Sequence, residues 1–223
     1  DPVNYWMHTN MLLLNGQKMA KSTGNYILPN EILTGKNKIL SKAFSPSVVR
    51  FFNMQANYRS ILDFSSDALE ASEKGYLKLM DAMTSLASLS TQKSSSVNIS
   101  EWKKKCYSAM NDDFNTPVLI SHIFEGVKFI NQIKEGKASI TSNDLVDLTS
   151  TMNAFVFDVL GLLNDVKDQV SGKIDGVVSL LIKLRKEARE NRDWALSDQI
   201  RDELLAMGIQ LKDGRDGTSY TIT

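Results

Sequence analysis

The fold class is decided by residues 116–130, which read TPVLISHIFEGVKFI. Proline is tolerated at the first position of a helix, so we expect Thr116 as the N-cap and Pro117 as the first helical residue. The apolar side chains that follow recur every three or four positions, as they do on one face of an α-helix: Leu119, Ile120, Ile123, Phe124, Val127 and Ile130. The stretch predicts a helix whose stripe is buried against other helices.

The same periodicity extends on both sides of this stretch. Upstream, Ser65 is expected to cap a helix whose apolar residues recur as far as Leu89. Downstream, we expect a helix that starts near Thr141, turns Val159 inward and stops at Gly161. Such helices bury their stripes by packing antiparallel in a bundle. The chain is therefore predicted to be mainly α.

Composition narrows the class of protein. The 223 residues are 42% hydrophobic and include 26 basic and 26 acidic side chains, so nucleic-acid binding would rest on local clusters of charge rather than on overall attraction. The single cysteine, Cys106, excludes an internal disulfide and favours a reducing compartment. His8 and His122 are far apart, which predicts no metal site, and both are expected as buried structural histidines. No apolar run is long enough to span a membrane.

Residues 11–25 carry the clearest chemical signal. The apolar run at 11–14 and the dipeptide Asn15-Gly16 predict a strand and a tight turn. Residues 18–25 then read KMAKSTGN, which sets Lys18 and Lys21 three positions apart. Ammonium groups on flexible stems suit the charge of a triphosphate, and Asn25 and the hydroxyls are expected to add neutral donors. The alternative is a solvated turn with two surface lysines.

The last part of the chain has a different pattern. Residues 166–176 are polar and predict a hinge, and residues 177–223 predict two helices and a small hairpin. Planar cations, acceptors and an aromatic ring suited to unpaired bases gather there: Arg189, Arg192, Trp194, Asp198, Arg201 and Asp213. From spacing alone the alternative is a helix pair with an ordinary salt-bridged face and a core Trp194.

An ordered series of motifs runs almost from end to end. Residues 18–22 match a Lys-Met-Ser-Lys-Ser signature loop, except that Ala20 stands where serine is usual. Further matches follow at 49–52, 58–60, 112–117 and between 188 and 209. In these motifs the chain resembles the class I aminoacyl-tRNA synthetases, and within them most of all the cysteinyl-tRNA synthetases.

The resemblance implies a division of the chain into five parts. These are the end of the catalytic domain with its KMSKS-type loop (1–30), a connector that contacts the inner bend of the tRNA (31–63), an antiparallel helical bundle of the anticodon-binding type (64–165), the hinge (166–176) and a small α+β unit that reads the anticodon (177–223).

The resemblance also implies roles for single residues. Lys18 and Lys21 would be catalytic and would stabilise the triphosphate, within an ATP-binding loop formed by Lys18, Met19, Ala20, Lys21 and Ser22. Lys21 is expected to make the direct contact, and Ser22 and Asn25 are expected to hold the shape of the loop. The tRNA would be bound by Arg189, Trp194, Asp198, Arg201 and Asp213. Tyr220 stands where the family often has tryptophan, which leaves a stacking role for the hairpin open.

The implied cofactor is ATP with Mg²⁺, and the implied partners are cysteine and tRNA(Cys), for a monomeric cytoplasmic enzyme. Zinc is expected in the intact enzyme, but in that family its ligands and the amino-acid pocket precede the region that this chain covers. Because the first residue is Asp1 rather than methionine, we expect a C-terminal fragment that is inactive alone.

Two other functions remain open at this point. A related ligase that attaches activated cysteine to a small amine-bearing sugar would have little use for residues 177–223. A non-catalytic helical RNA-binding or scaffold module would carry the lysine segment incidentally. A preference for the cysteine anticodon in tRNA binding distinguishes the synthetase from both.

Overall fold

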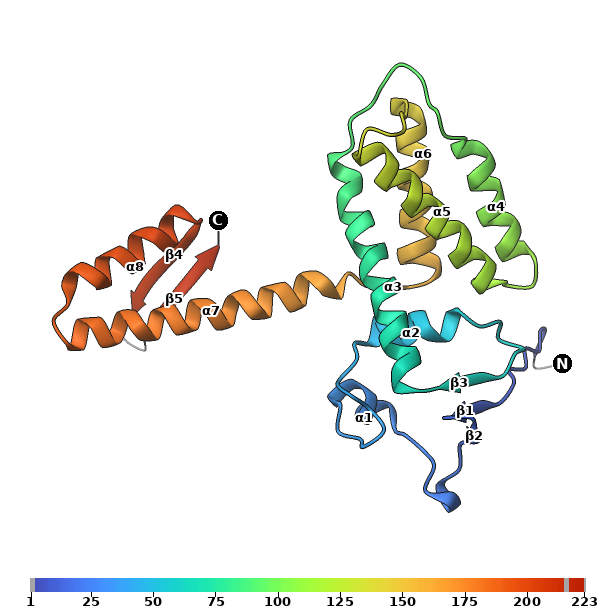
Figure 1. Cartoon of the computed structure of the whole chain (residues 1–223), viewed down its shortest axis with the longest axis horizontal. Coiled ribbons are helices and arrows are strands. Elements are labelled where there is room, and N and C mark those ends of the chain that lie inside the picture. The colour runs from blue at the N-terminus through green and yellow to red at the C-terminus, as the bar shows by residue number, and fades with distance from the viewer. Residues whose placement is uncertain (1–2, 215–216, 223) are drawn as a thin grey trace. The chain divides into compact units, whose positions relative to one another are not determined.

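The computed structural model describes residues 3–214 and 217–222, apart from the side chains at 165–175, 213, 214, 217 and 222. The chain divides into two compact units, unit 1 at Asp1–Asp165 and unit 2 at Val166–Thr223. Both are mainly helical and each contains a small sheet (Figure 1). The predicted mainly α class is confirmed. None of the described helices has both the length and the apolar character needed to cross a bilayer.

Unit 1 begins with a three-stranded sheet in the order β2-β1-β3. Its strands are β1 (Leu12–Leu14), β2 (Gln17–Lys18) and β3 (Leu62–Phe64). β1 is antiparallel to β2 and parallel to β3. The turn between β1 and β2 has φ values of 52° at Asn15 and 74° at Gly16, as a two-residue hairpin turn requires. The strand and turn predicted at 11–16 are confirmed.

Three helices follow the first two strands, with β3 between the second and third. They are α1 (Pro29–Thr34), α2 (Pro46–Met54) and α3 (Ser66–Ser85). Ser65 caps α3 by accepting a hydrogen bond from the Ala68 N–H at 3.2 Å, as predicted. The buried rings of Phe51 on α2 and Tyr76 on α3 have centroids 6.3 Å apart. α2 therefore joins the sheet region to the first helix of the bundle.

The bundle occupies the upper part of unit 1 in Figure 1. It consists of α3 with α4 (Ile99–Asn111), α5 (Thr116–Lys134) and α6 (Ser142–Asn153). The predicted α5 stripe is buried, with only Phe124 half-buried. On α4 the Trp102 Nε1–H donates to the His122 carbonyl at 2.6 Å. The indole lies over Gly126, where a side chain would collide with it.

The N-cap of α5 is one residue earlier than predicted. Asn115, not Thr116, accepts a hydrogen bond from the Val118 N–H, at 3.4 Å, and Thr116 is the first helical residue. Asparagine is at least as good a cap as threonine, and the shift still keeps Pro117 in the first turn, where its missing N–H is not needed.

The prediction that Val159 points inward is wrong. Residues Ala154–Val159 form a π-helical turn after α6, which adds one residue to the turn and shifts every later side chain around the helix axis. Val159 is consequently 45% exposed, and Leu160 takes the buried position at 1%. Gly161, predicted as the stop, has φ 61°.

Unit 2 consists of a helix pair and a hairpin. Its elements are α7 (Asp165–Glu190), α8 (Trp194–Ala206), β4 (Ile209–Gly214) and β5 (Gly217–Ile222). The strands pair antiparallel from Ile209↔Ile222 to Gly214↔Gly217, which confirms the small α+β unit. Residues 166–176, predicted as a polar hinge, are helical and form the first part of α7. Polar residues are tolerated in a helix, and each glycine costs only about 1 kcal/mol.

Candidate functional site

The lysine segment forms a projecting loop beyond the β1–β2 hairpin, at the bottom of Figure 1. Lys18 is the last residue of the edge strand β2, and Lys21 opens a short 3-10 turn that ends at Thr23. Gly24 then reverses the chain with φ 70°, a backbone conformation that favours glycine. The loop closes at an antiparallel bridge between Ala20 and Asn25, in which the Ala20 N–H donates to the Asn25 carbonyl at 2.9 Å.

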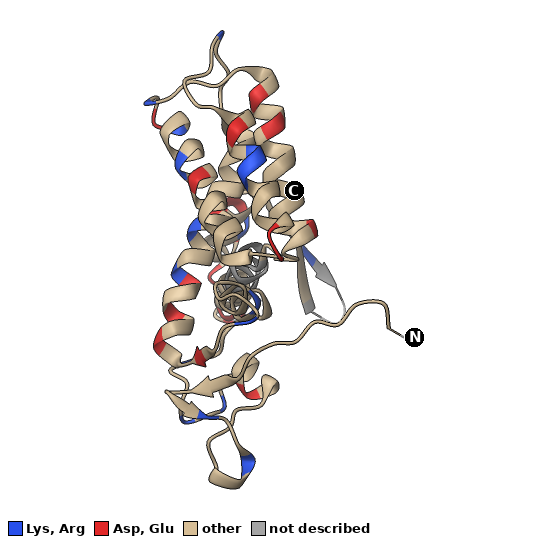
Figure 2. Ribbon diagram, turned by 90° about the vertical axis from the view of Figure 1, so that its right-hand side faces the viewer, with Lys and Arg blue, Asp and Glu red and all other residues tan. Residues whose placement is uncertain are grey.

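Both ammonium groups are available to a ligand. Lys18 and Lys21 are exposed, and within the described part of the chain no carboxylate lies within ion-pairing distance of either. Elsewhere the basic residues are often neutralised: on α4, Lys103 lies 2.9 Å from Asp147 and Lys105 lies 4.0 Å from Glu125. Figure 2 shows acidic and basic residues interleaved along the bundle helices. The lysine loop therefore presents two ammonium groups that no described carboxylate neutralises.

Two of the remaining polar side chains of the loop form hydrogen bonds with the backbone. Ser22 is exposed, but the Thr23 hydroxyl donates to the Ala20 carbonyl at 3.0 Å. The Asn25 side-chain amide turns inward, where its Nδ2 lies 3.3 Å, 3.4 Å and 3.2 Å from the carbonyl oxygens of Leu14, Gln17 and Lys18. Asn25 is thus engaged with the backbone, as expected of a residue that holds the shape of the loop, rather than offered to a phosphate as a neutral donor.

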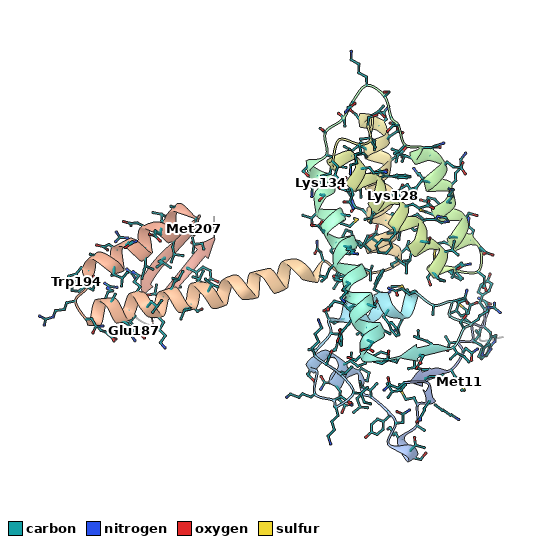
Figure 3. The ribbon with its side chains drawn as sticks, in the orientation of Figure 1. Met11, Lys128, Lys134, Glu187, Trp194 and Met207 are labelled. Atoms are coloured by element: carbon teal, nitrogen blue, oxygen red, sulfur yellow. The ribbon has the colours of Figure 1, made fainter. Side chains whose placement is uncertain are left out.

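The residues predicted to bind tRNA lie around α8 and the turn before it. Arg189 is in the last turn of α7, and Trp194 is the first residue of α8, with 58% of its surface exposed. Figure 3 shows Trp194 at the end of α8 next to α7, away from Met207 at the other end. Trp194 is not the core residue that the alternative reading expected.

The charges of α8 are partly paired with one another. Arg201 Nη1 lies 3.3 Å from an Asp198 oxygen and Arg201 Nε lies 3.0 Å from an Asp202 oxygen, at exposed positions. Because Trp194, Asp198 and Arg201 are spaced four and three apart, they share one face of the helix. Asp213 is in β4, but its side chain is outside the described residues.

Sequence reasoning missed a polar cluster between the connector and the α4–α5 turn. The Tyr58 hydroxyl donates to Asp113 at 2.8 Å, and Arg59 Nε lies 2.8 Å from the other Asp113 oxygen. These hydrogen bonds, the one from Tyr58 before the one from Arg59, hold the pKa of Asp113 below its usual value. Residues about fifty-five positions apart give no spacing signal from which such a contact could be found.

The structure places one histidine at the surface and the cysteine in the core. His8, expected to be buried, is exposed and stacks on Trp6 with ring centroids 6.0 Å apart. Cys106 is buried, and burial raises the pKa of its thiol to about 12. Among the residues that the structure describes, no group of three or more His, Cys, Asp or Glu side chains could hold a metal ion. These residues do not fit a zinc site.

The chain matches two family models. Residues 1–74 match the class I (C) tRNA synthetase catalytic domain and residues 105–164 match the DALR domain. It is 45% identical over its whole length to a cysteine–tRNA ligase of Bacteroides fragilis and 44% identical to that of Bacteroides thetaiotaomicron. A cysteine–tRNA ligase of Porphyromonas gingivalis is 43% identical over 99% of the chain.

The coverage of these relatives is partial, since the chain spans 46%, 46% and 45% of their respective lengths. The catalytic-domain match includes the sheet and the lysine loop, and the DALR match includes α5 and α6 of the bundle. The chain belongs to the class I aminoacyl-tRNA synthetases, in the family of the cysteine–tRNA ligases.

Proposed function

We propose that the chain is part of an enzyme that activates cysteine with ATP and transfers it to tRNA(Cys), and that it supplies the ATP-phosphate loop and the tRNA-binding surfaces. The observation that carries the proposal is the pair of exposed lysines, Lys18 and Lys21, on a closed loop and without a carboxylate partner among the described residues. The family match supports ATP as the nucleotide.

The chemistry assigned to the loop is charge neutralisation during adenylation. A carboxylate oxygen of cysteine attacks the α-phosphorus of ATP, the bond from that phosphorus to the bridging oxygen breaks, and pyrophosphate leaves with the negative charge. Lys21 donates hydrogen bonds to the departing phosphate oxygens, and Lys18, at the end of β2, stabilises the same group. Such donors act mainly in the transition state, where the charge develops.

Metal ions enter this proposal only as companions of the substrate or as parts of the whole enzyme. Mg²⁺ would arrive with ATP and would supply further charge neutralisation when bound. The described residues of this chain do not fit zinc, so no step is assigned to it. The whole enzyme is proposed to be monomeric and cytoplasmic, and this chain alone is expected to be inactive.

The second part of the proposal concerns anticodon reading by unit 2. Trp194 is an exposed ring beside a guanidinium and a carboxylate on the same helix face. Aromatic stacking with cationic and acceptor groups suits unpaired bases. Arg189 stands at the turn next to Trp194, and Asp213 is proposed from the family resemblance alone.

The ATP role is tested with Lys21→Ala in the whole ligase that carries this chain. Removing one strong donor to the leaving group should raise the adenylation barrier by about 3 kcal/mol, a loss of roughly a hundredfold in ATP–pyrophosphate exchange. Lys36→Ala, which removes an exposed lysine outside the loop, is the control and should exchange normally. Unchanged exchange in Lys21→Ala would rule out the role.

The tRNA role is tested by filter binding with the chain itself. The chain should bind tRNA weakly and with strong salt dependence, and it should prefer the cysteine anticodon over an altered one. Trp194→Ala should weaken binding about 5-fold to 150-fold, because stacking on one aromatic ring is worth about 1–3 kcal/mol. Met207→Ala removes an exposed apolar side chain at the other end of α8 and is the matched control.

The result of that assay also separates the competing functions. If tRNA binding does not depend on the anticodon sequence but Lys21→Ala shows the expected loss of ATP–pyrophosphate exchange, a cysteine ligase that acts on a small amine is favoured. Indifference to the anticodon together with no effect of Lys21→Ala favours a non-catalytic helical RNA-binding module.

A further inference from the structure

We infer that Asn25 is a positioning residue for the lysine loop, which fixes Lys18 and Lys21 through the backbone without touching the nucleotide. The inference rests on the proposed function, because it explains how the two lysines are held where phosphate can meet them.

The first observation is the number of acceptors that the Asn25 amide satisfies. Its Nδ2 lies within hydrogen-bonding distance of three carbonyl oxygens, those of Leu14 at the end of β1 and of Gln17 and Lys18, which make up β2. The two N–H hydrogens of one amide are thus shared among three acceptors on both strands of the hairpin. One side chain ties the hairpin to the far end of the loop.

The second observation is that the backbone of Asn25 closes the loop as well. Its carbonyl accepts from the Ala20 N–H at 2.9 Å, while the Lys21 carbonyl accepts from the Gly24 N–H at 3.1 Å. The side chain of Asn25 therefore anchors the carbonyl of Lys18, and its main chain anchors the residue before Lys21. Asn25 thus bonds the backbone of Lys18 itself and the backbone of Ala20, the residue that precedes Lys21.

The position needs an amide rather than another polar group. β2 is a two-residue edge strand, so its few ladder bonds leave it prone to fraying, and its carbonyls require donors. A carboxylate at position 25 offers only acceptors and would be repelled by three carbonyl oxygens, although its shape is nearly the same. Asn25→Asp therefore removes the donors with little change in volume.

The loss of these bonds should act on the reaction through the lysines. Without them the loop samples more conformations, and the ammonium groups spend less time where the leaving phosphate develops charge. We expect Asn25→Asp in the whole ligase to lower kcat for ATP–pyrophosphate exchange about tenfold or more, with little change in KM for cysteine. Asn30→Asp makes the same charge change on the exposed first turn of α1 and should leave exchange unaltered.

A double-mutant cycle with Lys21→Ala separates positioning from general destabilisation. If Asn25 works by placing Lys21, Asn25→Asp should cost much less in the Lys21→Ala background than in the wild type. Equal and additive losses in the two backgrounds would overturn the inference, since a purely structural role does not depend on Lys21.

Hydrogen exchange gives a readout that does not depend on activity. In the chain itself, Asn25→Asp should speed amide exchange at Ala20, whose N–H is bonded to Asn25, and leave the amides inside α5 unchanged. Unaltered Ala20 exchange would contradict the inference. If Lys21→Ala leaves ATP–pyrophosphate exchange unchanged, the proposed function fails. If Lys21→Ala slows ATP–pyrophosphate exchange but Asn25→Asp does not, only the present inference fails.

Discussion

Single residues in strained conformations mark the place where the connector meets the bundle. Asp113 and Phe114 both have positive φ, 52° and 54°, which costs non-glycine residues of the order of 1 kcal/mol each. The hydrogen bonds from Tyr58 and Arg59 to the Asp113 carboxylate hold this turn. The strained turn thus coincides with a contact from a distant part of the chain.

The cluster predicts a specific dependence of stability on pH. Because the pKa of Asp113 is lowered in the folded state, its contribution is present above the unfolded value of about 4 and is lost as the pH falls through the lower folded value. Asp113→Asn should therefore lower Tm at pH 7, and the difference from the wild type should shrink toward pH 3. Thermal melts across this range measure it.

Asp81→Asn, at an exposed position on α3, is the control for this experiment and isolates the effect of the cluster from a general change in charge. A Tm difference for Asp113→Asn that is constant between pH 3 and 7 would contradict the role of the carboxylate.

At the scale of elements, the helices of the bundle pack so closely in places that a larger side chain cannot be accommodated. α4 and α5 meet where Trp102 covers Gly126, and a Cβ at Gly126 would lie 2.8 Å from the indole and 3.0 Å from the Met152 sulfur. The π-helical turn after α6 then places Leu160 so that its carbonyl accepts from Arg50 Nε at 2.6 Å. These contacts fix the bundle helices and tie their end to α2.

The close approach at Gly126 predicts opposite outcomes for two Gly→Ala substitutions in unit 1. Gly126→Ala should lower the free energy of unfolding by about 1–3 kcal/mol, because the added methyl overpacks the site. Gly75→Ala on α3 should be neutral or stabilising by up to about 1 kcal/mol, since its Cβ would meet Phe51 at an ordinary 3.4 Å. Urea denaturation measures the free energy of unfolding of both variants. Equal changes in the two would show that helix propensity alone, and not the close approach at Gly126, determines the effect.

At the scale of the whole molecule, the buried apolar side chains that the structure describes are divided unequally between the two units. Most of the large buried side chains belong to unit 1, whereas the described core of unit 2 contains few apolar residues: Val178, Ala188 and Leu204. Small cores give marginal stability. The unit proposed to read the anticodon is therefore expected to be the less stable one.

This difference predicts two transitions in calorimetry. Leu204→Ala should lower the free energy of unfolding of unit 2 by the cost of a buried leucine, about 2–5 kcal/mol. The first transition should therefore move to a lower temperature, while the second keeps its temperature. Gly126→Ala should shift only the second. A single transition that both substitutions move together would contradict independent unfolding of the two units.

The sequence by itself determined the features that depend on residues a few positions apart. Local spacing and backbone preference account for the α5 stripe, the Ser65 cap, the Asn15-Gly16 turn, the hairpin at the end of unit 2 and the presence of Lys18 and Lys21 on one loop. The family resemblance could be recognised for the same reason, because its motifs are short and ordered along the chain.

The tertiary structure alone decided which distant groups meet. It placed Leu160 rather than Val159 in the core, joined Arg59 to Asp113, and turned the Asn25 amide toward carbonyls on two strands. The physical reason is that a hydrogen bond or a buried position depends on the path of the whole backbone, and one extra residue in a helical turn is enough to redirect it.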